Sequence, residues 1–488
     1  MRRLTLLLFA LVALGCGGGG DRGALARVRA RGVLRWGGDV QGGEPYVFQD
    51  SAHAGRLTGF EVELADAIAR EMGVRAEFVQ NDWSALIPSL ERDTFDVAMN
   101  GVEVTPSRVG RVAFTRPYFI FSERLMARRD DRSVGPSIEA LRGRRVGTLS
   151  NSLAFERLRD LATVVPYEGT EEPYIDLAQG RTDAVLLDHI IAARYGEPNP
   201  ALRVVGDVME GHYSIAVRPG DVALHRAVDE ALGRVIARGE LRAILTRWSL
   251  WDARQERLAR WRPEDQDAML GPRRAAPTLN RGHVALFVKG AGATLLVSFL
   301  AMALAIPLGM LLAVSRLYGP RWLGALATGY VEVLRGTPVL LQLYVLYYGL
   351  AGVVRLDAFT AAVIGLGLNY GAYEGEVYRA GIQAVPKGQM EAAMALGMST
   401  PLALRRVILP QAFRLALPSV TNDFIALLKD SSLVSVITVV ELTKQMTITA
   451  VDVRGWLAPG ALCALMYFVM SYPLSVLARR LEARLARQ

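Results

Sequence analysis

The chain has 488 residues, 51% of them hydrophobic, and a mean hydropathy of +0.22, which allows two or three domains and favours a membrane protein over a soluble one. Its formal net charge is +8; basic cytoplasmic loops of a membrane protein explain this charge better than nucleic-acid binding does. Two cysteines exclude a disulfide framework.

The N-terminus has the features of an export signal. Arg2 and Arg3 precede an apolar run over residues 4–14, which is too short to span a bilayer comfortably. Gly15-Cys16 and the glycines that follow resemble a lipoprotein processing site and tether, so we predict that Cys16 is lipidated. Ordinary cleavage and an uncleaved anchor remain alternatives. Each of these readings of residues 1–20 exports the segment that follows.

Residues 33–250 alternate β-rich runs with helical patterns. One helix is predicted over Gly59–Met72, where apolar residues recur at helical spacing. This alternation predicts an α/β fold with parallel strands, and such sheets bind ligands beyond the carboxyl ends of their strands. The predicted strands are Val33–Gly37, Phe95–Met99, Val146–Leu149 and Ala184–Leu187.

Several motifs in this segment resemble solute-binding proteins of the polar-amino-acid class (family 3 type). The clearest are Leu57–Ala65, Asp82–Leu90, Thr105–Arg108, Phe114–Tyr118 and Gly180–Val185. The resemblance implies a two-lobed periplasmic-binding-protein fold over residues 21–251. It also implies that the lobes close on a ligand about hinges near residues 123–126 and 210–215.

The resemblance also implies where the ligand binds. Arg108 offers a planar fork of donors for a carboxylate, and Asp188, at a strand end, accepts from an ammonium group. Gly101 allows a close backbone approach, Ser152 brings a hydroxyl from the second lobe, and Trp83 covers the side-chain end. Two alternatives remain open: Asp188 as a helix cap and Trp83 as a core residue.

Two departures from the family pattern affect the choice of substrate. Glu103 stands where the family has Ser or Thr, and a carboxylate there repels the ligand's carboxylate unless it pairs with Arg108 or meets a cation. The ligand-stacking aromatic expected near Gly42-Gly43 is missing. An amino acid remains the first choice, with another small polar or cationic solute as the alternative.

Residues 252–285 are predicted to form a linker, and residues 286–488 an all-α transmembrane domain. Apolar segments suggest five spans, of which the second and fourth are longer than the roughly 20 residues required and are therefore broken or tilted. Basic residues after the first span, after the third span and in the tail place these parts in the cytoplasm. The five segments lie near 291–315, 322–352, 358–381, 413–440 and 457–478.

A polar, helix-forming loop lies between the third and fourth predicted spans. It resembles the "EAA" loop of ABC-importer permeases, on which an ATPase subunit docks. No Gly-x-x-x-x-Gly-Lys-Ser/Thr loop occurs in the chain, so energy must come from such a partner. The predicted docking residues are Glu391, Ala392, Ala393, Gly397, Leu409 and Pro410.

The predicted spans also carry polar residues, which are costly in a bilayer and tend to line a path. Tyr330–Pro338, Gly381–Gln389 and Leu427–Leu433 resemble amino-acid ABC permeases of the HisM/GlnP type, and this implies a second permease copy, identical or related, around one pathway. We expect about half of the polar candidates to face it. The candidates are Arg335, Gln342, Asn369, Glu374, Asn422, Lys429, Asp430 and Glu441, and the residues predicted to line the path are Arg335, Asn369, Glu374, Asn422 and Glu441.

Together these features resemble an ABC importer of the polar amino acid uptake family, with the solute-binding protein fused to its permease. The resemblance implies an inner-membrane transport subunit without its own enzymatic activity, cofactor, metal or nucleic acid, with the binding domain outside and the C-terminus in the cytoplasm. A ligand-gated channel is less favoured, because no apolar segment interrupts residues 33–250. An enzyme with the same lobed fold, using Glu103 as an acid, is the other alternative.

Overall fold

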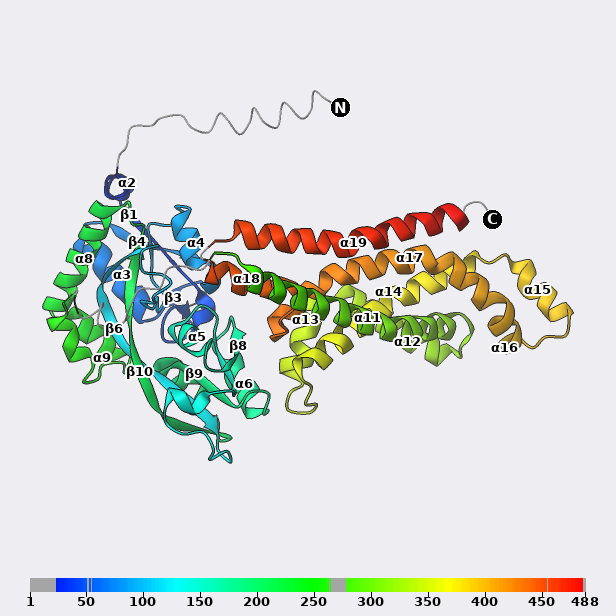
Figure 1. The fold of residues 1–488 in the computed structure, drawn as a ribbon, viewed down its shortest axis with the longest axis horizontal. Helices are drawn as coiled ribbons and strands as arrows, with labels where there is room; N and C mark the ends of the chain where they lie inside the picture. Colours follow the sequence, from blue (N-terminus) through cyan, green and yellow to red (C-terminus); the bar gives the residue numbers. More distant parts are fainter. Residues whose placement is uncertain are drawn as a thin grey trace, which may run out of the picture. The chain divides into compact units, whose positions relative to one another are not determined.

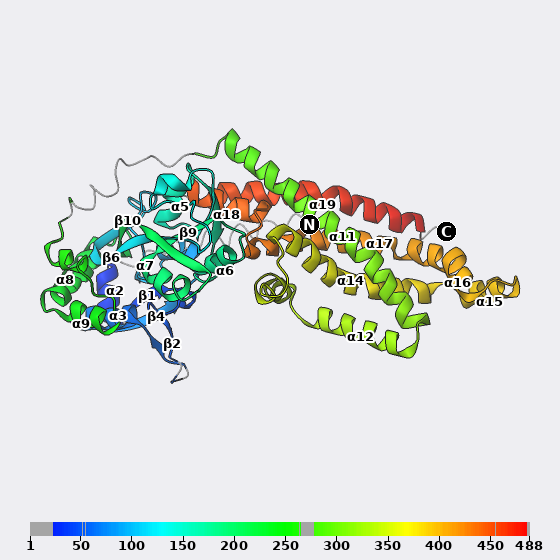
Figure 2. The same ribbon diagram turned by 90° about the horizontal axis from the view of Figure 1, so that it is seen from below.

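The computed structural model describes residues 23–50, 52–53, 55–262, 264, 278–453 and 455–485. The predicted signal peptide with Cys16 and part of the predicted linker lie outside the described residues. The contacts divide the chain into two compact units, and Figures 1 and 2 label their helices and strands. The first contains the chain up to Glu123, Asp188–Arg194 and Asp207–Arg273; the second contains Arg124–Leu187, Tyr195–Gly206 and the chain from Arg274 onward.

The first unit is an α/β layer. Strand β1 (Val33–Gly38) pairs in parallel with β4 (Arg75–Gln80) and β5 (Val97–Ala98), and β10 (Leu202–Val217) pairs antiparallel with β5. The predicted strands at Val33 and Phe95 are confirmed, the latter only over Val97–Ala98. The helices are α2 (Ala24–Arg31), α3 (Phe60–Glu71), α4 (Leu86–Glu91), α7 (His189–Ile191), α8 (Val222–Ala237) and α9 (Glu240–Arg247).

Helix α3 and several short turns complete the first unit. Helix α3 buries Phe60, Leu64, Ala67 and Ile68, so the apolar spacing in the sequence identified its buried face. The remaining short elements are the 3-10 turns η1 (Val40–Gly42), η2 (Trp83–Ala85) and η5 (Gln255–Arg260), the β2 (Phe48–Gln49)–β3 (Leu57–Thr58) hairpin and the π-turn η4 (Ala192–Gly196).

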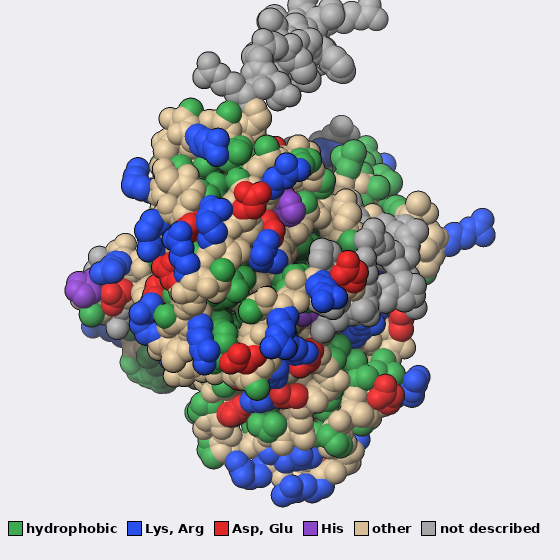
Figure 3. Space-filling model, turned by 90° about the vertical axis from the view of Figure 1, so that its left-hand side faces the viewer, with side chains coloured by type: hydrophobic (Ala, Val, Ile, Leu, Met, Phe, Trp, Pro, Cys, Tyr) green, Lys and Arg blue, Asp and Glu red, His purple; other side chains and the backbone are tan. Residues whose placement is uncertain are grey.

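Ion pairs join the outer helices of the first unit. Arg247 of α9 lies 2.6 Å from Glu63 of α3, and Arg234 of α8 lies 2.8 Å from Glu71. Figure 3 shows basic and acidic side chains interspersed over the face that it draws. Such mixed charge produces local pairing rather than a field of one sign.

The second unit begins with a smaller α/β layer. Strand β7 (Arg145–Leu149) pairs in parallel with β8 (Thr163–Tyr167) and with β9 (Ala184–Asp188), as the sequence predicts for β7 and β9. Its helices are η3 (Ile138–Leu141), α5 (Leu153–Leu158) and α6 (Glu172–Ala178). We call residues 124–187 and 195–206 the second-lobe segment.

Two long strands, β6 (Ala113–Arg128) and β10, continue from one unit into the other. Along β6 the chain passes from the first unit to the second between residues 123 and 124, and along β10 it returns to the first unit between residues 206 and 207. The first change lies in the predicted hinge, and the second lies before the predicted range of 210–215. The Arg129 N–H donates to the Ala201 carbonyl at 2.8 Å, and antiparallel pairing in this register places 206–207 opposite 123–124.

The rest of the second unit, which we call the helical part, consists of helices from Arg281 onward. Helix α11 packs closely on α14, where a Cβ added to Gly309 would lie 2.5 Å from Glu374 Cβ; such small residues allow helices in membranes to approach. The helices are α11 (Arg281–Tyr318), α12 (Arg321–Gly336), α13 (Val339–Tyr344) with the π-turn η6 (Val345–Gly349), α14 (Ala358–Ala384), α15 (Lys387–Ala395), α16 (Thr400–Ala403) with the π-turn η7 (Leu404–Ile408), α17 (Leu409–Asp430) with the 3-10 turn η8 (Ser431–Ile437), α18 (Leu442–Asp452) and α19 (Leu457–Leu485).

Two of the described helices, Arg281–Tyr318 and Leu457–Arg480, are long and apolar enough to cross a membrane by length and composition. The predicted count of five spans is therefore not confirmed. The predicted second and fourth spans are broken, after Gly336 and after Asp430. Helices α12, α14 and α17 carry several charged residues each, which lowers their hydropathy below that of α11.

The segment after Asp252 packs on a hinge strand, although the sequence assigns it to the linker. Gln255 is fully buried; its Oε1 accepts from the Ile120 N–H at 2.9 Å, and its Nε2 donates to the Ile120 carbonyl at 2.8 Å. Arg254 also contacts Asp207, at 3.3 Å. The start of the linker is therefore fixed to β6 and β10 of the first unit.

We expect Gln255→Ala to expose the Ile120 amide to exchange, because two buried backbone groups lose a side-chain partner, at a cost of about 1–3 kcal/mol each. Protection of that amide should fall about ten-fold or more, measured by hydrogen exchange on the full-length chain. Glu256→Ala is the matched control, because its side chain is 61% exposed. Equal protection in both variants would contradict the role of Gln255.

Candidate functional site

Three of the predicted binding residues, Gly101, Glu103 and Asp188, lie beside Tyr213, a fully buried residue of β10. Its hydroxyl donates to Asp188 Oδ2 and lies 2.8 Å from the Tyr46 hydroxyl. Its backbone forms a β-bridge with Glu103. Tyr213 was not predicted as a site residue, and its aromatic neighbour Tyr46 follows directly on the segment where the sequence lacked the expected aromatic.

Arg108, Trp83 and Glu103 lie together on the same side of this group. The Arg108 guanidinium lies 5.0 Å from the centre of the Trp83 ring, and its Nη1 donates to the Glu103 carbonyl at 3.0 Å. Arg108 is 6% exposed and Trp83 is half-buried. Stacking and this hydrogen bond hold the planar fork in one orientation.

Asp188 ends β9 and precedes α7, so it was also a candidate helix cap. Its side chain makes no capping hydrogen bond to α7; Tyr213 donates to it instead. Burial raises the pKa of Asp188 to about 7, against the opposing effect of the hydrogen bond from Tyr213. A neighbouring cation would stabilise its charged form.

Three buried carboxylates meet in the first unit. Oxygen atoms of Glu103, Glu123 and Asp188 all lie within 4.8 Å of one another, and each residue is at most 5% exposed. Like charges at this separation favour protonation or a bound cation. Glu123 was not a predicted site residue; its position inside the predicted hinge was the available signal.

Gly101 has φ +58, and an added Cβ would lie 3.0 Å from the Tyr46 ring, so glycine is required there. Its N–H donates to Glu61 Oε1 at 2.6 Å, and Tyr118 donates to the same atom. Burial raises the pKa of Glu61 to about 7. The Gly101 N–H thus contacts a carboxylate of the chain itself, and the predicted approach of this backbone to a ligand carboxylate stays a prediction.

Asp39 positions Trp83. One carboxylate oxygen of Asp39 accepts from the Trp83 N–H at 2.9 Å and the other from Gln80 at 3.1 Å. The Asp39 N–H donates to Asn100 at 2.8 Å. Asp39 was not predicted, although it directly follows the carboxyl end of a predicted strand, where ligand sites gather.

Ser152 belongs to the second unit and is described there. Its hydroxyl accepts from the Phe155 N–H at 3.1 Å and donates to the Leu149 carbonyl at 2.9 Å, so it caps α5. Ser152 is 1% exposed. Ser150 of the same turn has its hydroxyl 3.0 Å from Glu168.

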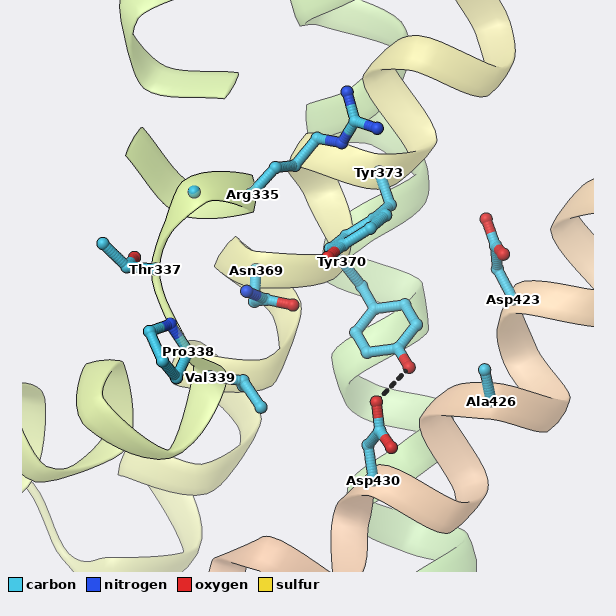
Figure 4. Close-up of a pocket in the computed structure, with 11 residues that line it drawn as sticks. Arg335, Thr337, Pro338, Val339, Asn369, Tyr370, Tyr373, Asp423, Ala426 and Asp430 are labelled. Atoms are coloured by element: carbon cyan, nitrogen blue, oxygen red, sulfur yellow. Dashed lines mark hydrogen bonds between the residues drawn. The ribbon is translucent and has the colours of Figure 1, made fainter. Parts of the chain in front are cut away.

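A cavity of about 500 Å³ lies in the helical part (Figure 4). Arg335 and Asn369, two of the predicted path residues, line it, and Arg335 lies over the Tyr373 ring at 5.3 Å. The Tyr370 hydroxyl donates to Asp430 at 2.7 Å. The complete lining is Arg335, Gly336, Thr337, Pro338, Val339, Asn369, Tyr370, Tyr373, Asp423, Ala426 and Asp430.

The other predicted path residues do not line this cavity. Glu374 is fully buried against α11, and Asn422 is exposed on α17. Glu441 accepts from the Lys444 N–H at 2.7 Å and from the Tyr467 hydroxyl at 3.0 Å, so it caps α18. Asp423 was missed because the sequence gives no way to distinguish it from its neighbour Asn422.

The predicted docking loop forms α15, a tight turn, α16 and η7. Gly397 has φ +78, and the Met398 N–H donates to the Ala393 carbonyl at 3.1 Å, as in a Schellman turn. Glu391, Ala392 and Pro410 are exposed, Leu409 is half-buried and Ala393 is buried. Leu396 is 83% exposed, an apolar side chain in a position to contact a partner.

Comparison with known proteins separates the chain into two matched regions. Residues 35–250 match the family of bacterial extracellular solute-binding proteins, family 3. Residues 305–487 match the binding-protein-dependent transport system inner membrane component. The first match contains Arg108 and Asp188, and the second contains the cavity and the predicted docking loop.

Individual proteins match each region. The glutamine transport system permease protein GlnP of Escherichia coli is 38% identical over 206 residues, covering 41% of this chain and 94% of that protein. The L-cystine transport system permease protein TcyB of Bacillus subtilis is 42% identical, covering 37% and 78%. The structure of holo ArgBP from T. maritima is 30% identical, covers 46% of this chain and 98% of that one, and has a TM-score of 0.40. The chain therefore belongs to the binding-protein-dependent transport system inner membrane components, with a family 3 solute-binding domain fused ahead of its membrane component.

Proposed function

We propose that this chain is the fused binding and permease subunit of an ABC importer that captures a polar amino acid outside the cell. The observation that carries the proposal is that buried Arg108 donates to Glu103, whose backbone bridges Tyr213, while Tyr213 donates to buried Asp188, within a family 3 binding domain. Arg108 receives the carboxylate and Asp188 the ammonium group. Trp83 covers the side-chain end.

The remaining site residues complete this proposal. Gly101 provides the close backbone turn, and Ser152 presents its turn from the second lobe as the lobes close. Relatives of the permease part are named for glutamine and cystine transport, which supports an amino acid as cargo. No resident cofactor or metal is part of the proposal.

A cationic solute is the second candidate. The close group of Glu103, Glu123 and Asp188 favours it, because a ligand with an additional positive group would neutralise this buried charge. Both candidates use the same first unit and differ in the charge of the ligand's side chain.

The affinity for an ammonium-bearing ligand should depend on pH through Asp188. Its pKa is about 7 without ligand, and a bound ammonium group lowers that pKa, so binding releases a proton at pH 6. Affinity should therefore rise as pH increases from 6 to 8. Calorimetry in two buffers of different ionisation enthalpy measures the number of protons released on binding. Asp188→Asn should abolish this proton release together with most of the affinity. Proton uptake at pH 6 would contradict this role.

In the membrane we propose five spans, a cytoplasmic C-terminus and a second permease copy around one pathway lined by Arg335 and Asn369. Asn369 and Arg335 line the same cavity, which supports their place in the pathway. Glu374, Asn422 and Glu441 remain predictions for the assembled dimer. An ABC ATPase subunit docks on the loop of α15, α16 and η7, and Cys16 carries the lipid anchor.

The proposal is tested by titrating the full-length chain in lipid nanodiscs with the twenty amino acids and with polyamines. Saturable binding of one amino acid class supports the importer of polar amino acids. Binding of polyamines or of basic amino acids alone selects the cationic solute. No heat with either set contradicts both choices of cargo.

A further inference from the structure

Within the second unit, the second-lobe segment contacts the helical part through a buried ionic group. Asp176 of α6 is 1% exposed. Its Oδ1 lies 2.9 Å from Arg181 Nη1, and its Oδ2 accepts from Tyr347 at 2.8 Å and from Tyr167 at 2.6 Å. Both carboxylate oxygens are therefore satisfied, which a buried charge requires.

Arg181 and Tyr347 make two further contacts. The Arg181 guanidinium lies 4.0 Å from the centre of the Tyr347 ring, and its Nη2 donates to the Tyr347 carbonyl at 3.2 Å. Tyr347 is 1% exposed. A residue of η6 in the helical part is thus held by its ring, its hydroxyl and its backbone.

A second ion pair supports the same contact. Lys444 Nζ of α18 lies 3.0 Å from Glu168 Oε1, and the Lys444 side chain is 6% exposed. Glu168 also accepts from Ser150, next to the predicted ligand residue Ser152. Opposite charges therefore meet across the contact at Lys444 and Glu168, whereas Asp176 and Arg181 both belong to the second-lobe segment and contact the neutral Tyr347.

Tyr347 is connected to the cavity through one short helical segment. The π-turn η6 continues α13, which begins directly after Pro338, and Pro338 and Val339 line the cavity. Gln342 of α13 accepts from Asn369, a lining residue, at 3.0 Å. Isolated π-turns of this kind occur frequently at functional sites.

We propose that Asp176 and Arg181 dock the binding domain on Tyr347 of its own chain, and that α13 transmits this docking to the cavity. The proposal rests on the proposed import function for its purpose, but the contact itself is independent of the cargo. In this proposal the docking is intramolecular, and the second-lobe segment is the docking surface. Because α13 leads directly into the turn that contains Tyr347 and begins at the wall of the cavity, a shift of η6 changes the shape of the cavity.

Cross-linking tests the docking. Glu168→Cys and Lys444→Cys, which leave Asp176, Arg181 and Tyr347 in place, are combined in a full-length chain with Cys16 and Cys463 replaced by Ser and a protease site inserted between residues 263 and 277. A short bismaleimide is used, since Lys and Glu side chains separate the two backbones too far for a direct disulfide. The two halves should stay joined at monomer mass after proteolysis. The control pair is Asp130→Cys with Lys444→Cys, because the Asp130 side chain is 87% exposed.

Two outcomes would overturn docking within one chain: a cross-linked dimer before proteolysis, which places the contact between copies, and no more joining than in the control. Neither depends on amino-acid binding, so failure of the proposed cargo is distinguishable. If the halves are joined but no amino acid binds, docking stands and the cargo assignment fails.

Tyr347→Phe tests the transmission, because it removes the hydroxyl and keeps the ring under Arg181. Uptake of a mixture of the twenty radiolabelled amino acids into proteoliposomes, with the copurifying ATPase, should fall about ten-fold, while binding to the same chain stays unchanged. Tyr344→Phe, in the preceding turn, is the control and should keep full uptake. Unchanged uptake in Tyr347→Phe would overturn the role of α13.

Discussion

Replacing Arg108 with Ala should weaken amino-acid binding by about 100-fold or more. Arg108 is 6% exposed, and loss of one partner of a buried ion pair costs about 3–5 kcal/mol, which corresponds to at least ~100-fold in Kd. Arg108→Lys should recover only part of the loss, because an ammonium group lacks the planar fork. Calorimetric titration of the full-length chain in nanodiscs measures each Kd.

Arg111→Ala is the matched control for this prediction. Arg111 lies three residues further along, where it makes two hydrogen bonds to Glu91, at 2.9 and 2.8 Å, in an exposed pair. Such surface pairs contribute about 0–1 kcal/mol, so binding should change little. If both variants bind with the same Kd as the unaltered chain, Arg108 does not hold the carboxylate. A thermal unfolding curve for each variant separates loss of binding from loss of folding.

The sequence predicted the individual α/β elements well, because their signals are local. Helix α3 and strands β1, β7 and β9 follow from apolar spacing and from β-rich runs. The packing of residue 255 on β6 was not predicted. Gln255 forms a hydrogen bond with Ile120, which lies 135 positions earlier in the chain. The sequence gives no indication that a polar residue following a domain has such a distant partner.

The residues of the candidate site were predicted by motif, whereas the groups that contact them were not, and the role of these residues in binding stays a prediction. Arg108, Glu103 and Trp83 lie together as expected, whereas Tyr213, Tyr46 and Glu123 were found only in the structure. Tyrosines in a strand or after a proline are ordinary core residues in a sequence. Their contribution depends on the convergence of β6, β9 and β10, which are separated along the chain.

In the helical part, the breaks in the second and fourth predicted spans were predicted from excess length. The cavity lies beside both breaks, since Gly336 and Asp430 line it. Broken helices free backbone groups and therefore occur where a membrane protein lines an internal space. The excess length of these two spans therefore coincides with the place of the cavity, whereas the capping of α18 by Glu441 was not predicted.

Leu396→Glu should disrupt assembly with the ATPase subunit while the chain still folds. Leu396 is 83% exposed in the turn after α15, so a charge there costs the isolated chain little. An apolar anchor buried by a partner contributes about 2–4 kcal/mol, and its loss lowers affinity by ~30-fold to ~1,000-fold. The measurement is recovery of the ATPase that copurifies with the unaltered chain, followed by ATP-driven uptake in proteoliposomes.

Val353→Glu is the control for this substitution, because Val353 is equally exposed, at 85%, and lies outside the loop. Gly397 gives an independent test of the turn: at φ +78, Val is strained by about 1–3 kcal/mol whereas Asn tolerates this region. Gly397→Val should therefore impair ATPase recovery and Gly397→Asn should not. Full ATPase recovery with Leu396→Glu and with Gly397→Val would place the docking surface elsewhere. If Val353→Glu also lowers ATPase recovery, any added surface charge weakens assembly, and the loss with Leu396→Glu is not specific. Only a loss confined to the loop identifies α15 and its turn as the surface that the ATPase contacts.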